Sequence, residues 1–126
     1  MKDIVTYINE SNANQVIFNA CMELDNNEDI YKTQYWPLVQ SLVKKHKAGN
    51  FNIETLETSQ SVSKLATATL KAIKADNLSN EDRKRLYKFI TGNLLNTISN
   101  EGEDLTKEEE DYMIEWDYNN TDKCGW

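Results

Sequence analysis

Apolar residues recur at helical spacing through most of the chain. Between Ala13 and Leu24 they stand at i, i+3, i+4, i+7, i+8 and i+11, which predicts an amphipathic helix over this range. Ser11 and Asn12 come directly before it and are expected to cap its first turn. The preceding segment, 2–10, has a spacing that fits either a short helix or a short strand.

The most strongly predicted helix spans Tyr35–Gly49. Pro37 fits its first turn, where a missing backbone N–H is tolerated, although one longer helix kinked at Pro37 is an alternative. The last turn is basic, which suits the negative end of the helix dipole, and Gly49 supplies a left-handed cap. We expect the other helices to pack around this one, with Tyr35 and Trp36 anchoring its start and a turn of helix over 28–34 leading into it.

Two further helices are predicted in the middle of the chain. One runs from Ile53 to about Lys74 and carries many small side chains, which would let another helix approach closely. We therefore expect its face to be the central contact of the bundle. The other follows an N-cap at Ser79, has acids in its first turn, and extends to about Ile98.

The last predicted helix is acidic. Thr106 and Glu109 form a capping box, which predicts a helix from Lys107 to about Tyr118, while the composition of 119–126 predicts an unstructured tail. Helical patterns with short connections and no domain linker indicate an all-α fold. The expected fold class is a single-domain bundle of four to five helices with a C-terminal acidic helix.

Charge divides the chain into two parts. Residues 1–100 hold 11 acidic and 12 basic side chains and sum to +1, whereas residues 101–126 hold 10 acidic and 2 basic side chains and sum to −8. The 126 residues fit one domain. We therefore expect a helical bundle body over 1–100, with an acidic C-terminal segment over 101–126 that packs on it or extends from it within one domain.

The chain shows no sign of a membrane span or a leader. Its apolar runs are far shorter than the roughly 20 residues that cross a bilayer. The N-terminus lacks the apolar core of a signal peptide. These features predict a cytoplasmic protein without membrane contact. Cys21 lies on an apolar helix face and is expected to be buried, and no disulfide with Cys124 is expected in a reducing compartment.

Residues able to do chemistry are sparse. His46 stands between Lys45 and Lys47, so it is read as a structural histidine at the end of an apolar stripe rather than a base or a ligand, since no orienting acid lies near it in sequence. The glycines form no phosphate loop, and no metal-ligand spacing occurs. The carboxylate-rich stretches 25–29 and 101–104 fit caps and turns. We expect no catalytic, cofactor-binding or metal-binding residues, and no enzymatic activity.

The acidic segment is the most unusual feature, because aromatic residues are interleaved with its carboxylates. It could bind a basic partner, imitate nucleic-acid phosphates, or fold back on the chain's own basic clusters. Alternatively, its aromatics pack on the bundle and its acids face water. Trp126, at the end of the chain, would dock on this chain or on a partner. The candidate protein-binding residues are Glu108, Glu109, Asp111, Tyr112, Glu115, Trp116 and Trp126.

Two basic clusters could contact phosphates. Together with Lys64, Lys71 and Lys74 they could make one phosphate-binding face, or they could be ordinary solvated helix surface. The near-neutral charge of the body argues against a nucleic-acid role. The candidate phosphate-binding residues are Lys44, Lys45, Lys47, Arg83, Lys84, Arg85 and Lys88.

One motif resembles a known group of proteins. In the stretch Tyr35–Phe51, an aromatic-Pro-Leu start leads to Ser-Leu-Val-Lys-Lys, then to a glycine and an aromatic residue. This pattern resembles small uncharacterised helical proteins of tailed phages and bacterial mobile elements. The resemblance implies a phage or mobile-element origin. It implies no activity or site residues, and the acidic segment departs from the pattern.

Taken together, these features predict a non-catalytic interaction protein, encoded by a phage or mobile element, that docks to a protein assembly as a virion or assembly accessory. It would then lie in the host cytoplasm or the virion, with a viral assembly or a second copy of itself as partner. One alternative is an inhibitor of a host nucleic-acid-binding defence machine, through an acidic phosphate-mimicking segment. Another is a weak nucleic-acid binder that uses the two basic clusters.

Overall fold

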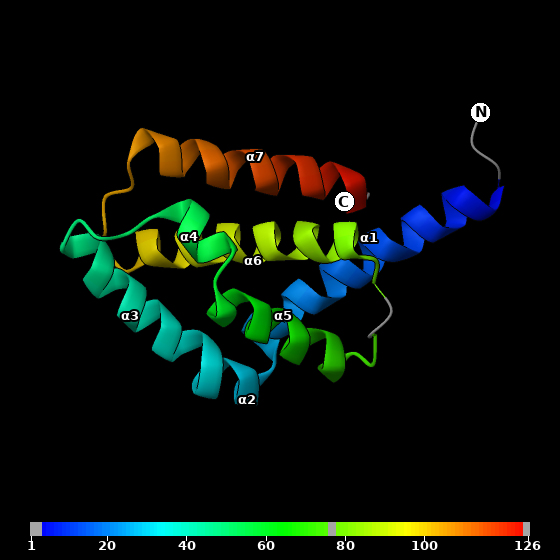
Figure 1. The fold of residues 1–126 in the computed structure, drawn as a ribbon, viewed down its shortest axis with the longest axis horizontal. Coiled ribbons are helices and arrows are strands. Elements are labelled where there is room, and N and C mark those ends of the chain that lie inside the picture. Colours follow the sequence, from blue (N-terminus) through cyan, green and yellow to red (C-terminus); the bar gives the residue numbers. More distant parts are fainter. Residues whose placement is uncertain (1–3, 76–77, 125–126) are drawn as a thin grey trace.

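Helix α6 (Asn80–Asn100) runs through the middle of the molecule in the computed structural model (Figure 1). The structure describes the backbone of residues 4–75 and 78–124, and the side chains of 13–75 and 78–115. Around α6 lie α1 (Ile4–Asn26), α3 (Trp36–Lys47), α4 (Ile53–Glu57), α5 (Gln60–Ala72) and α7 (Lys107–Cys124). The described backbone contains no strand, so the expected all-α bundle is confirmed.

The central position of α6 corrects the expectation that the other helices pack around Tyr35–Gly49, or on the face of small residues in 53–74. Helix α6 packs on α1, α3, α4, α5 and α7. Its apolar residues turn to more than one side, so a single helix can cover several partners. Its fully buried members are Leu86, Ile90, Leu94, Leu95 and Ile98.

Helix α1 is longer than expected. It begins at Ile4 and continues without a break through Ser11 and Asn12, so segment 2–10 is helical where it is described, and the prediction of a cap at these two residues is wrong. The apolar stripe over 13–24 is confirmed. It faces the core through Ile17, Ala20, Cys21 and Leu24.

The start of α3 follows a widened turn. Helix α2 (Glu28–Ile30) leads into the π-helical segment η1 (Tyr31–Tyr35), which joins α3 directly, and Pro37 lies in the first turn of α3 as expected. Tyr35 is buried and anchors this start, because its hydroxyl donates to the Asn93 side chain on α6. The aromatic anchor predicted at Tyr35 and Trp36 is thus present.

The helix predicted from Ile53 to Lys74 is two helices. The Thr58 hydroxyl donates to the carbonyl of Glu54, which ends α4, and the Ser59 side chain accepts from the N–H of Val62, which caps α5. Hydroxyl side chains compete with the helical backbone for hydrogen bonds, so this break follows from local chemistry. The apolar pattern continued across the break and concealed it.

Helix α7 lies along α6 and crosses the top of the bundle in Figure 1. It extends to Cys124, so the prediction of an unstructured tail is wrong for 119–124, and residues 125–126 lie outside the described part of the chain. Trp126 lies outside the described residues, and so does the side chain of Trp116. Among the described helices, none combines the length and the apolar character that a membrane span requires.

Candidate interaction surface

The first turn of α7 is fastened to the body through Glu109. The N–H of Thr106 donates to Oε1 of Glu109 at 2.8 Å, and the N–H of Glu109 donates to Oγ1 of Thr106 at 3.2 Å. This confirms the capping box. The same Oε1 lies 2.9 Å from Nε2 of His46 in the last turn of α3. One buried carboxylate, 6% exposed, therefore caps its own helix and ties it to another.

A second carboxylate completes this attachment. Nδ1 of His46 lies 3.3 Å from Oε1 of Glu103, and Nζ of Lys47 lies 3.8 Å from Oε2 of the same residue. The imidazole also packs against the ring of Phe51, with centroids 5.5 Å apart. We name the group of His46, Lys47, Glu103 and Glu109 the His46 clasp. It joins the end of α3 to the connection between α6 and α7.

The surroundings of His46 favour its charged form. The hydrogen bond with Glu109 raises the pKa of His46 above its ordinary value of 6.5, burial opposes the rise, and Glu103 adds to it. His46 helps to attach α7, and the two acids that orient it, which the sequence did not reveal, come from 57 and 63 residues away along the chain. In the part of the chain that the structure describes, no group of three or more His, Cys, Asp or Glu side chains is arranged to hold a metal ion.

A second attachment lies farther along α7. Tyr112 is turned inward, and its hydroxyl donates to Oε2 of Glu57 at 3.0 Å. Nζ of Lys88 lies 3.9 Å from Oε1 of the same carboxylate. Burial and the neighbouring Glu57 raise the pKa of Tyr112, so the phenol stays protonated and donates. This bond fixes the rotation of α7 about its axis.

The fixed rotation turns a row of carboxylates toward solvent. Ile114 stands among them with 59% of its surface exposed, one of two large apolar side chains that are exposed among the described residues. Helical spacing places it beside the carboxylates three or four positions earlier and next to Glu115. We name this surface the acidic outer face. It consists of Glu108, Glu110, Asp111, Ile114 and Glu115, all of them exposed.

The predicted protein-binding residues therefore separate into three groups. Glu108, Asp111 and Glu115 lie on the acidic outer face. Glu109 and Tyr112 point inward, so the structure gives them the task of holding α7 rather than of touching a partner. Trp116 and Trp126 are not described at the side-chain level.

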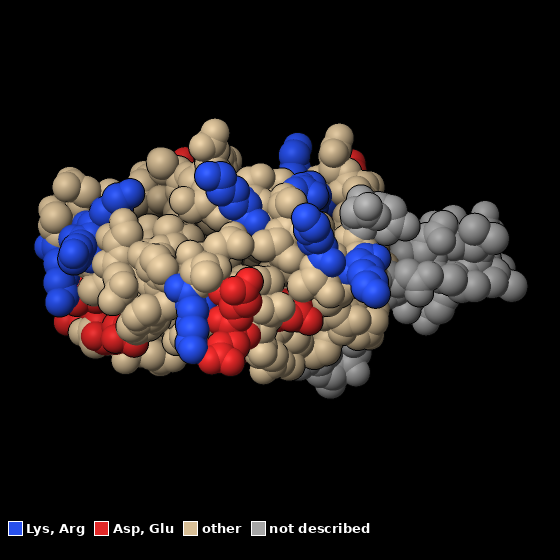
Figure 2. Space-filling view, turned by 90° about the horizontal axis from the view of Figure 1, so that it is seen from below, with Lys and Arg blue, Asp and Glu red and all other residues tan. Residues whose placement is uncertain are grey.

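The two basic clusters do not converge. Lys44, Lys45 and Lys47 lie at the end of α3, whereas Arg83–Lys88 lies in the first turns of α6, at the opposite end of the bundle (Figure 1). Figure 2 shows Lys and Arg side chains over the face seen from below in separate groups, with uncharged surface and carboxylates between them. The visible face therefore carries no continuous phosphate-binding strip.

The basic side chains of the Arg83–Lys88 cluster also contact different neighbouring helices. Arg83 donates to Thr67 on α5, Arg85 donates to Asn14 on α1, and Lys88 lies near Glu57 on α4. Arg85 further pairs with Asp82 at 3.0 Å. Arg83, Arg85 and Lys88 are therefore half-buried rather than ordinary solvated helix surface, because α6 is covered on several sides. Lys84 is exposed.

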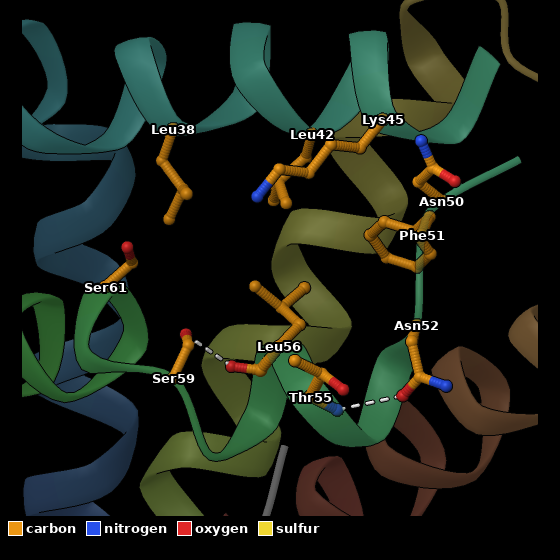
Figure 3. A pocket seen from close by; sticks show the side chains of 10 residues that line it. All are labelled: Leu38, Leu42, Lys45, Asn50, Phe51, Asn52, Thr55, Leu56, Ser59 and Ser61. Carbon is orange, nitrogen blue, oxygen red and sulfur yellow. Dashed lines mark hydrogen bonds between the residues drawn. The ribbon is translucent and has the colours of Figure 1, made fainter. Parts of the chain in front are cut away.

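A shallow groove of about 160 Å³ lies between α3 and α4 (Figure 3). Leu38, Leu42 and Leu56 form its apolar wall. The Asn52 side chain caps α4 by accepting from Thr55, and the Ser59 hydroxyl donates to the carbonyl of Leu56. Among the described lining residues, Lys45 alone is ionisable. The groove thus offers shape and apolar contact rather than acid–base chemistry.

Three residues that matter for this surface were not singled out from the sequence. Glu57 belongs to no motif, Glu103 was interpreted only as part of an acidic turn, and the partners of both lie far away along the chain. Ile114 could have been found by its helical position, because it falls opposite Glu109 and Tyr112 once these two are placed inward. The helical periodicity of α7 could have placed Ile114 on its outer side, but only if the buried face of the helix was already known.

Comparisons with protein-family models, with curated proteins and with solved structures find no match to this chain. The resemblance of Tyr35–Phe51 to phage and mobile-element proteins therefore stays a prediction.

Proposed function

We propose that the protein is a non-catalytic interaction protein that docks to a basic surface of a protein assembly through its acidic outer face. The observation that carries this proposal is the exposure of Ile114 within a row of four exposed carboxylates. With 59% of its surface exposed, Ile114 gains little from burial in the bundle itself. Covered by a partner, it would supply apolar contact while the carboxylates select a basic surface.

The attachments of α7 support the same proposal. Rigid presentation of a docking face lowers the entropy that is lost on binding. The His46 clasp fixes the first turn of α7, and the Tyr112 bond to Glu57 fixes its rotation. The helix backbone that carries the acidic outer face is therefore fixed before a partner arrives.

The resemblance of the Tyr35–Phe51 stretch makes the proposal more concrete. We take the assembly to be a virion or an assembly intermediate, for which this chain is an accessory. A basic partner that itself binds nucleic acid is a second candidate, because carboxylates spaced along a helix can occupy phosphate positions. In that case the protein would act as an inhibitor, and nucleic acid would compete with it for the partner.

A photo-crosslinking experiment tests the docking face. A benzophenone amino acid placed at position 114 should capture one partner in the native cells, identified by mass spectrometry. The same group at the exposed Met22 on α1 is the matched control, and should not capture that partner. Replacing Glu110, Asp111 and Glu115 by lysine should abolish the crosslink while the melting temperature stays close to that of the unchanged protein.

The outcomes separate the candidates. A captured partner released by added DNA indicates the phosphate-mimic inhibitor, and one that sediments with particles indicates the assembly accessory. Equal capture from positions 22 and 114, or a crosslink that survives the triple lysine variant, would rule out the acidic outer face as the docking site.

A further inference from the structure

A cavity of about 430 Å³ that is open to solvent lies between the end of α5 and the first turns of α6. Leu70, which is 2% exposed, and Ala75 supply apolar lining. Cationic side chains supply much of the rest. The described lining residues are Thr67, Leu70, Lys71, Lys74, Ala75 and Arg83. The cavity therefore combines a positive side with an apolar side, and it lies apart from the acidic outer face in sequence and in composition.

The ion pairs among the described side chains do not include the cations of this cavity. Elsewhere, Lys32, Lys47, Arg85 and Lys88 each lie within 4 Å of a carboxylate oxygen. Among the side chains of 13–75 and 78–115, no ion pair is found for Lys71, Lys74 or Arg83, and Asp76 lies outside the described residues. Three like charges around one hollow repel one another, and a bound anion would relieve that repulsion.

Arg83 is held in place for binding. Its Nε donates to the Tyr87 hydroxyl at 2.7 Å, one of its terminal nitrogens donates to Thr67, and its guanidinium lies 5.7 Å from the centre of the Tyr87 ring. A guanidinium carries five N–H donors in a fixed plane, and these bonds use two of them. The others keep an orientation that suits the oxygens of a phosphate.

Lys74 adopts an unusual backbone conformation at the rim of the cavity. Its φ of 57° makes it the one non-glycine residue in the left-handed region among the described residues. The N–H of Ala75 bonds to the carbonyl of Leu70, and that of Lys74 to Lys71, which is a Schellman turn. The equivalent positions after α3 and α6 are Gly49 and Gly102. A lysine here strains the backbone and adds a third cation to the cavity.

We propose that this cavity binds the phosphate group of a small phosphomonoester. Lys71, Lys74 and Arg83 would contact the phosphate oxygens, and the carrier of the phosphate would lie against Leu70 and Ala75. The pocket geometry, the fixed orientation of Arg83 and the strained backbone of Lys74 each point to an anion. The proposal is independent of partner docking through α7.

Titration of inorganic phosphate and of phenyl phosphate, followed by calorimetry and by NMR of backbone amides, tests the site. Phenyl phosphate should bind several-fold more tightly than inorganic phosphate, because its ring would cover the apolar lining. The variants K74G and R83Q should each weaken binding at least tenfold. K44Q, an exposed lysine at the other end of the bundle, is the matched control and should leave the affinity unchanged within twofold.

The K74G variant separates a loss of binding from a loss of folding. Glycine accepts the left-handed conformation without strain, so this variant should melt no lower than the unchanged protein. Lost binding in a protein of equal or higher melting temperature then reports the missing ammonium group.

Three results would overturn the proposal. These are the absence of saturable binding of either phosphate probe, equal weakening by K44Q and K74G, and amide shifts outside the cavity. If the protein binds single-stranded DNA, and K44Q weakens this binding as much as K74G does, the cations contact a phosphate backbone diffusely. That result would also overturn the small-molecule site.

Discussion

The ends of α3 and α5 have the same local design but opposite electrostatic surroundings. Each helix has lysine in its last turn and closes with a Schellman turn. At the end of α3, His46 and Lys47 meet Glu103 and Glu109 from the α6–α7 connection. At the end of α5, the lysines face Arg83 around a cavity. Among the described side chains, a basic helix end is thus an internal attachment in one place and faces further cations in the other.

The difference shows that the role of a basic helix end depends on the side chains that neighbouring elements place beside it, and not on the basic turn alone. Lysines at a helix C-terminus are favoured by the dipole in both places. What differs is whether another element delivers carboxylates to them. The following predictions test this contrast, beginning with the largest expected effect.

Replacing Glu109 by alanine should destabilise the fold most. The change removes the hydrogen bond to His46 and the cap of α7, and it leaves buried polar groups unpaired, so we expect a loss of about 2 to 3 kcal/mol in the free energy of unfolding. Urea denaturation measures it. Glu108→Ala, at the exposed neighbouring position, should cost less than about 0.5 kcal/mol. Equal effects of the two changes would contradict the structural role of the clasp.

The stability of the clasp should depend on pH through His46. Because folding raises the pKa of His46, its contribution is fully present below the ordinary pKa of 6.5 and is lost as the pH rises through the folded value. The free energy of unfolding should therefore fall from about pH 6 toward alkaline pH. His46→Gln should remove this slope. A slope that persists unchanged in the variant would assign the titration to another group.

Relief of strain at Lys74 should stabilise the other helix end. We expect Lys74→Gly to raise the free energy of unfolding by about 1 kcal/mol, because glycine adopts a positive φ without a steric penalty. Gly49→Lys at the matching position after α3 should lower it by a similar amount. Thermal denaturation at equal pH compares the two. If both changes act in the same direction, backbone strain does not distinguish the two ends.

Removing a single charge at the cavity should have the smallest effect. Lys71 is exposed and has no carboxylate partner among the described residues, so Lys71→Gln should change the free energy of unfolding by less than about 0.5 kcal/mol, toward greater stability if at all. Chemical denaturation at low ionic strength measures it. A clear loss of stability would reveal an attractive partner for this lysine.

Local chemistry made much of the fold predictable. The stripe of α1, the position of Pro37, the N-cap at Ser79 and the capping box of α7 each depend on residues within one or two turns, and each is present. The break at Thr58–Ser59 was missed because the apolar pattern continues across two helices that pack on the same core. Helix ends at Asn12 and Tyr118 were misplaced because capping side chains can also lie within a helix.

The candidate sites were less accessible, because they join distant segments. Carboxylates at 103 and 109 meet an imidazole at 46, and the phenol at 112 meets the carboxylate at 57. The sequence showed that the C-terminal segment is acidic and amphipathic, but it left open whether those acids bind a partner or the chain itself. The structure divides them, with Glu103 and Glu109 turned to the clasp and the exposed carboxylates of α7 turned to solvent.

By itself, then, the sequence determined an all-α bundle, the positions of most helices and an uneven distribution of charge, because these follow from periodicity and composition along the chain. Only the tertiary structure decided which helix is central, which carboxylates are used internally and which cations are left around a cavity. The physical reason is that charge and hydrogen-bond pairing depend on distance in space, and helix packing sets those distances.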